Sequence, residues 1–258
     1  MNVIFEGTCL NGRDGKVTVS TSNRLSLFFH RDSQAPVAIP LNIDAVTVQH
    51  HLVSLGKSPK IKIIEHLFSA LYGLNLFKVK IDFGSDELPF YDGSSAPFVT
   101  LLSRIKNSSS VDHFMPERAI IVTESDSFLH YEPVQDNNLN IDMQLSHPYI
   151  TTQRVIITVN KKNYTREIAP ARTFVYTTED DPRLKNLPPY GIGVTRKKFY
   201  SATPLRFRNE LVRHKILDLL GDLYVIKKRL VGKITCKNTS HYLNLKFVKK
   251  LIEYLKDT

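Results

Sequence analysis

The sequence has only two cysteines, Cys9 and Cys236, which lie far apart and without a Cys-x-x-Cys spacing. This scarcity argues against a disulfide framework and against a zinc site built from cysteine pairs, so both thiols are expected to be free and buried. Long apolar runs are missing as well, because no segment approaches the ~18 consecutive apolar residues of a membrane span. We therefore expect no transmembrane helix.

The beginning of the chain, MNVIFEGTCLNGRDGKVTV, lacks a basic segment followed by the apolar core of a signal peptide. This absence predicts a cytoplasmic location. With 42% hydrophobic and 23% charged residues, the composition is that of an ordinary globular protein. A chain of 258 residues can bury a sizeable core, either in one large domain or in two small ones.

The formal net charge of +10 comes with basic clusters at 195–200, 225–230 and 246–256. Such charge attracts nucleic acid, anionic lipid or a phosphorylated small molecule. Lysines on solvated faces explain any single cluster equally well. Since no aromatic-interleaved RNA-binding pattern accompanies the clusters, nucleic acid is not expected as a partner.

Alternating apolar residues predict strands, and helical periodicity interrupts them. The strands are expected within 16–22, 24–31, 77–84, 139–147 and 154–161, and the helices within 62–74, 97–105, 207–228 and 244–256. The polar stretch KNSSSVDH, residues 106–113, is the best linker candidate. We therefore predict an α+β protein of two similar two-layer β/α sandwich domains, 1–108 and 113–258. They are expected to pack helix face to helix face with the active site between them.

The segment VRHKILDLLGDL, residues 212–223, carries three polar side chains inside a helical pattern of leucines. His214, Asp218 and Asp222 are spaced by four, so they project from one side of a helix. The series can be a solvated stripe, or a His–Asp pair worth roughly 0.2–0.5 kcal/mol to the helix. It can also present two metal ligands, because imidazole and carboxylate are zinc ligands and one helical turn separates such pairs. A third ligand must then come from elsewhere.

A short repeat nominates that ligand. In EHLFSALYG a leucine stands five residues after His66 and a glycine seven residues after it. In RHKILDLLG a leucine and a glycine stand at the same distances after His214. If two similar halves pack helix to helix, His66 can face His214 and Asp218. Glu65 points about 100° away from its neighbour, so it would flank the metal and accept a proton from water. The pattern indicates metal-assisted hydrolysis, whereas Glu65 read alone would be a surface glutamate.

Five segments resemble, in their order, the motifs of the zinc-dependent UDP-3-O-acyl-N-acetylglucosamine deacetylases, which commit the pathway to lipid A. They are IEHLFSALYGL (64–74), ELPFYDGSSAPFV (87–99), ARTFVY (171–176), LRFRNELVRHKILDLLGD (205–222) and SHYLN (240–244). The resemblance runs through most of the chain. It implies a zinc-dependent amide hydrolase whose partner is an acylated UDP-sugar. We also expect a monomer and a transient contact with an anionic membrane surface.

Carried over position by position, the resemblance implies zinc ligands at His66, His214 and Asp218, where iron(II) could also bind. It implies a general base at Glu65. A zinc ion would polarise the amide carbonyl and lower the pKa of water towards ~7.

The same resemblance implies that His241 is the positively charged partner that stabilises the intermediate and helps to protonate the leaving amine. Asp222 would be hydrogen-bonded behind His241. Thr173 would contact the oxyanion, Lys215 would lie in the substrate site, and Phe174 would begin the segment that shapes a passage for the acyl chain.

The chain departs from the family pattern at positions that are expected to recognise the substrate. Asn11 replaces a histidine, Ser240 a glycine and Leu245 an asparagine, and the stretch 186–195 differs from the usual Gly-Gly-Ser. Two alternatives therefore stay open. One is a homologous zinc amidase for another N-acetylated sugar, and the other is a non-catalytic protein that binds anionic ligands.

Overall fold

The computed structural model describes residues 1–30, 35–49, 51–105, 111–184 and 190–257. Its strands and helices confirm the α+β class that the alternation in the sequence predicts. The five predicted strands and four predicted helices all occur among the described elements, each within a few residues of its expected place.

The first half of the chain builds a five-stranded sheet from segments that pack one face on the core. Its order is β1 (Asn2–Thr8), β2 (Asp14–Thr21), β8 (Val79–Phe83), β3 (Ser26–Phe29) and β4 (Val37–Ala38). All neighbours are antiparallel except β8 and β3, which are parallel. Buried residues alternate with outward ones along β2 and β8, as the period of two in their sequences requires.

The second half repeats this topology. Its sheet runs β10 (Ile120–Glu124), β11 (Ser127–Glu132), β18 (Gly232–Lys237), β12 (Leu139–His147) and β13 (Ile150–Val159), again with one parallel pair, β18 and β12. In both sheets the last strand in sequence occupies the centre. The matching strand order gives the short sequence repeat a structural counterpart.

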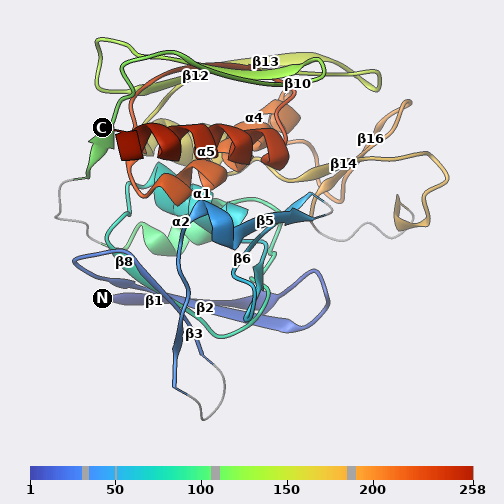
Figure 1. Ribbon diagram of the computed structural model, residues 1–258. Helices are drawn as coiled ribbons and strands as arrows, with labels where there is room; N and C mark the ends of the chain where they lie inside the picture. The colour runs from blue at the N-terminus through green and yellow to red at the C-terminus, as the bar shows by residue number, and fades with distance from the viewer. Residues whose placement is uncertain (31–34, 50, 106–110, 185–189, 258) are drawn as a thin grey trace.

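Four helices lie between the two sheets and form the inner layers of the molecule (Figure 1). They are α1 (Glu65–Gly73), α2 (Ala96–Leu102), α4 (Glu210–Leu223) and α5 (His241–Asp257). In each half one of these helices precedes the central strand and one follows it. Every residue of α1 is buried, because α1 lies between its own sheet and α4.

Smaller elements complete the fold. One three-stranded sheet consists of β5 (Val46–Gln49), β6 (Leu52–Leu55) and β7 (Ile61–Lys62), and another of β14 (Phe174–Tyr176), β15 (Ile192–Val194) and β16 (Phe199–Tyr200). The strands β9 (His113–Phe114) and β17 (Arg229–Leu230) form a pair. The short helices are α3 (Lys161–Asn163), a π-helix at Tyr164–Ile168 and 3-10 turns at Ile43–Ala45, Pro182–Leu184 and Tyr224–Ile226. The strands β14, β15 and β16 project beside the inner layers (Figure 1).

The predicted linker at 106–113 lies mostly outside the described residues, so the domain limits 1–108 and 113–258 stay a prediction. Within the described ranges, no helix is both long enough and apolar enough to cross a bilayer. Cys9 and Cys236 are both free and buried, as their spacing predicts.

Candidate active site

The amino-terminal turn of α1 and the middle of α4 bring three predicted ligands together. One donor atom from each of His66, His214 and Asp218 lies within 4.8 Å of the other two. His214 Nε2 is 3.2 Å from Asp218 Oδ1, one turn further along α4. All three residues are at most 4% exposed. The helical spacing therefore has the geometry that the sequence predicts.

Main-chain contacts orient two of these residues. His214 Nδ1 lies 3.0 Å from the carbonyl oxygen of Ala171, and because a carbonyl only accepts, Nδ1 carries the proton. Nε2 is then the ring nitrogen that faces the cluster, 3.2 Å from Asp218 Oδ1, as a metal ligand requires. The Ser95 hydroxyl donates to the carbonyl of His66 at 2.8 Å and so ties the start of α1 to the segment before α2.

A glycine allows α1 and α4 to approach this closely. A Cβ at Gly221 would stand 2.3 Å from the carbonyl oxygen of Glu65. The glycine of the first repeat, Gly73, allows a different close contact, because a Cβ there would meet the ring of Tyr164 in the π-helix at 2.2 Å. Both repeat glycines thus mark close packing around the helices that carry His66 and His214.

Glu65 lies beside the cluster, and one oxygen of its buried carboxyl group is unpaired. The residue is 3% exposed, and its Oε2 has no hydrogen-bond partner. Burial raises the pKa of Glu65 to about 8, although the positive charge of His241 opposes the shift. Burial also lowers the pKa of His66 to about 3, with His214 adding to the effect. His66 is therefore neutral, as a metal-ligating imidazole must be.

His241, the first residue of α5, forms a buried pair with Asp222 of α4. The distance from His241 Nδ1 to Asp222 Oδ2 is 2.8 Å, and Asn244 Nδ2 donates to the same oxygen at 2.8 Å. Burial would lower the pKa of His241, but the carboxylates of Asp222 and Asp218 outweigh it and raise that pKa to about 9. His241 is thus an imidazolium at neutral pH, with Nε2 3.9 Å from Asp218 Oδ1.

Sequence reasoning missed Asn244 and the Ala171 carbonyl. Asn244 follows His241 by three residues on one helix, so the shared face of α5 is the signal that could have found it. The Ala171 carbonyl has no sequence signal, because every residue carries a carbonyl and only the fold aims this one.

Lys215 borders the cluster. Its ammonium group donates to Asp218 Oδ2 at 2.8 Å, while the side chain is 15% exposed. Burial disfavours the Asp218 carboxylate, yet Lys215 and the two nearby histidines hold its pKa well below the usual value. Asp218 is therefore an ionised donor.

Thr173 and Phe174 lie directly after the segment that orients His214. The Thr173 N–H donates to the carbonyl of Gly93 at 2.8 Å, and the carbonyl of Thr173 accepts from Ile192. The Phe174 ring lies edge-on to His214, with 6.2 Å between ring centroids. Phe174, the first residue of β14, thus borders the cluster, and Thr173 precedes it directly.

Two departures from the family pattern have local explanations. The backbone and side-chain amides of Asn11 donate to the two carboxylate oxygens of the buried Glu87, at 3.0 and 3.3 Å. Ser240 accepts from the Leu243 N–H at 3.1 Å and so caps the helix that begins with His241. Leu245 packs against the core. Of the altered stretch 186–195, residues 186–189 lie outside the described part of the chain.

The residues fit a metal ion in their chemistry. Two imidazoles and one ionised carboxylate form a three-ligand donor set, and tetrahedral zinc places its ligand atoms about 3.3 Å apart. The 3.2 Å between His214 Nε2 and Asp218 Oδ1 agrees with that spacing. A carboxyl group with a free oxygen and an imidazolium beside such a set are typical of hydrolases that use a metal ion.

Comparisons with known proteins agree with this class. A model of the family described as LpxC, UDP-3-O-acyl N-acetylglycosamine deacetylase, matches residues 2–253. A UDP-3-O-acyl-N-acetylglucosamine deacetylase of Sulfurimonas denitrificans is 36% identical over 240 residues, covering 88% of this chain and 80% of that protein. The proteins of the same name from Xanthomonas axonopodis pv. citri and Geotalea uraniireducens are 33% and 28% identical, over 88% and 97% of this chain and 78% and 86% of their own lengths.

The chain belongs to the LpxC family of deacetylases, which catalyse the committed step of lipid A biosynthesis. The family resemblance of its five motifs is thereby confirmed.

Proposed function

We propose that this protein hydrolyses the acetamide of UDP-3-O-acyl-N-acetylglucosamine to UDP-3-O-acylglucosamine and acetate. The buried His66–His214–Asp218 cluster, with the unpaired Oε2 of Glu65 beside it, is the observation that carries the proposal. The names of the curated relatives supply the substrate.

We propose zinc as the metal and His66, His214 and Asp218 as its ligands, with iron(II) as the alternative metal in the cell. A bound zinc ion would supply Lewis acidity to the amide carbonyl and would ease deprotonation of water.

The protein side chains then divide the proton transfers. Glu65 takes the proton of the attacking water as the C–O bond forms, and the Thr173 hydroxyl donates to the developing oxyanion. His241 passes its proton to the sugar nitrogen as the C–N bond breaks, and Asp222 holds its ring in place. Acetic acid and a free amine result, and the acid loses the second proton of the water to solvent as it leaves as acetate.

We propose that Lys215 and the wall that begins at Phe174 receive the substrate. Lys215 is a cation at the edge of the cluster, suited to the polar sugar nucleotide, and Phe174 offers an apolar ring for the acyl chain. A monomer, a cytoplasmic location and transient contact with an anionic membrane agree with this substrate, and they stay predictions.

Metal analysis tests the ligand assignment directly. The purified chain is expected to hold about one zinc ion, and His214→Ala or Asp218→Ala should each weaken binding, since a catalytic site has only three protein ligands. Elemental analysis after dialysis measures the content. Full metal retention in both variants would contradict the assignment.

Acetate release distinguishes the proposed substrate from the alternative. The acylated UDP-sugar should be turned over faster than other N-acetylated sugars. Preference for another sugar would favour the redirected amidase, for which Asn11 in place of histidine is the motivating observation. Metal-free protein with steeply salt-dependent anion binding would favour a non-catalytic protein.

A further inference from the structure

A fully buried ion pair lies behind the site, where the reaction does not use it. Arg172 is 1% exposed and Glu210 is 0% exposed. The Arg172 guanidinium donates to Glu210 Oε1 through Nε at 2.8 Å and to Oε2 through Nη2 at 3.1 Å. The backbone N–H of Arg172 adds a third bond to Oε1, at 3.1 Å.

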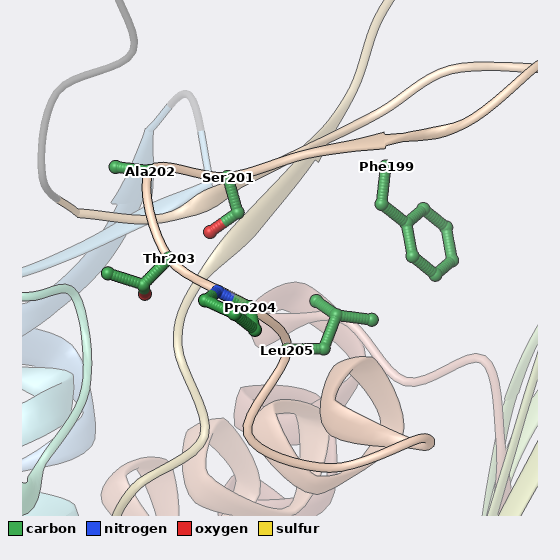
Figure 2. A pocket seen from close by; sticks show the side chains of 6 residues that line it. All are labelled: Phe199, Ser201, Ala202, Thr203, Pro204 and Leu205. Carbon is green, nitrogen blue, oxygen red and sulfur yellow. The ribbon is translucent and has the colours of Figure 1, made fainter.

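The remaining donors of Arg172 hold the loop that follows β16. Nη1 donates to the hydroxyls of Ser201 and Thr203 at 2.8 and 2.7 Å, and Nη2 to the carbonyl of Pro204 at 3.0 Å. This loop forms an open pocket whose six lining residues run from Phe199 to Leu205 (Figure 2). A buried charge is costly unless it is fully paired, and every N–H of this guanidinium has a partner.

The pair joins two segments that carry site groups. Glu210 begins α4, one helical turn before His214. Arg172 lies between Ala171, whose carbonyl orients His214, and Thr173, whose backbone binds Gly93. A shift of Arg172 against Glu210 would therefore move the Ala171 carbonyl and Thr173 together relative to His214.

We propose that the Arg172–Glu210 pair is a positioning device for the catalytic centre. It sets the register between the segment 169–173 and the first turn of α4, and through that register it orients His214 and places Thr173. The inference rests on the proposed metal site. Neither residue touches the substrate, so the pair acts only through the residues that it positions.

Glu210→Asp tests the proposal by geometry. The variant keeps the charge at the start of α4 but withdraws the carboxylate by about 1.5 Å, the length of one C–C bond. Loss of an orienting contact behind a ligand typically costs 10–100-fold in metal affinity. We expect weaker zinc binding in that range, measured by competition with a chromophoric chelator, and an altered visible spectrum of the cobalt(II)-loaded protein. The kcat should fall by a similar factor with KM nearly unchanged.

Arg229→Lys is the matched control. Arg229 is another buried arginine, but its guanidinium donates to Asn75 and to the carbonyl of Val159 rather than to the site. This variant should lose stability while keeping the wild-type zinc affinity and cobalt spectrum. If Glu210→Asp has the same zinc affinity and cobalt spectrum as this control at an equal folded fraction, the pair only stabilises the fold and the proposal is wrong.

A second variant covers the case in which Glu210→Asp does not fold. Ser201→Ala combined with Thr203→Val removes two acceptors of Arg172 but leaves the ion pair, and neither side chain is fully buried. We expect a smaller change of the cobalt spectrum in the same direction, and an unchanged spectrum would overturn the proposal. Wild-type protein that binds zinc without deacetylating the UDP-sugar would contradict the proposed function alone.

Discussion

At the scale of single residues, burial sets the chemistry of this site. Glu65 and His66 are neighbours on α1, and both are nearly inaccessible to water. Burial raises the pKa of the carboxyl group to about 8 and lowers the pKa of the imidazole to about 3. In each case the neutral form is favoured, because a charge is costly away from water. Burial thus makes the Glu65 carboxylate a stronger base, because it holds an accepted proton more tightly, and it keeps His66 a neutral ligand.

Glu65→Gln should separate the base from the metal. The amide has nearly the same shape and cannot accept a proton, so turnover should fall by roughly 10²–10⁴ while the metal stays bound. Steady-state kinetics and elemental analysis measure the two quantities. Glu253→Gln, on the exposed side of α5, serves as the control and should change neither. Metal loss in Glu65→Gln would mean that Glu65 is itself a ligand.

Asn244→Ala tests the support behind His241. Asn244 donates to the oxygen of Asp222 that also binds His241, and a hydrogen bond to a buried charge is worth about 1.5–3 kcal/mol. We expect kcat to fall by roughly 10–100-fold with full metal content. Asn140→Ala, on the half-buried outer side of β12, should leave kcat at the wild-type value. An unchanged kcat in Asn244→Ala would show that Asp222 needs no second partner.

At the scale of elements, the site depends on how closely α1 and α4 pack. Gly221→Ala would place a methyl group 2.3 Å from the Glu65 carbonyl, so the helices must separate. We expect a loss of about 1–3 kcal/mol in the free energy of unfolding, as for overpacked cores, together with weaker zinc binding. Denaturant titration and chelator competition measure both. Gly84→Ala should be tolerated, because its Cβ would meet Lys16 at an ordinary 3.4 Å. Wild-type zinc affinity in Gly221→Ala would contradict this role of the glycine.

The helices could be predicted from sequence because α1 and α4 carry local signals. Their apolar periodicity and the spacing of His214 and Asp218 depend only on helical geometry. The glycine of the repeat was visible too, but its function was not, since it depends on the Glu65 carbonyl of another helix. The three-stranded sheet of β14, β15 and β16 was not predicted, because its strands have only two or three residues each. The loop after β16 is held by hydrogen bonds from Arg172 to Ser201 and Thr203, which are about 30 residues away in the sequence.

At the scale of the whole molecule, side chains join the two halves directly. Arg206 donates to Asp92 of the first half at 2.6 Å and to the carbonyl of Pro170 at 2.7 Å. Burial would raise the pKa of Asp92, but hydrogen bonds from Ser94 and Arg206 hold it below the usual value. The contact thus stabilises the fold while Asp92 is ionised.

Asp92→Asn should therefore destabilise the protein in a pH-dependent manner. Because the folded pKa lies below the unfolded value of ~3.9, this stabilisation is present above pH ~4 and is lost as the pH falls through the folded pKa. We expect about 1–3 kcal/mol less stability than wild type at pH 7, and a shrinking difference on acidification, in denaturant titrations across pH. Asp126→Asn, at a 75% exposed side chain, should match wild type throughout. A difference that is independent of pH would mean that the charge of Asp92 is irrelevant.

The placement of the last strand at the centre of each sheet has a consequence for synthesis of the chain. Neither β11 nor β12 can complete its hydrogen bonds until β18 inserts between them, and β18 ends at Lys237 of the 258 residues. One edge of β11 and one edge of β12 therefore keep unpaired backbone N–H and C=O groups until β18 has left the ribosome. Such edges pair readily with other chains, so a chaperone that shields β12 during translation should raise the yield of folded protein more than one that acts after release.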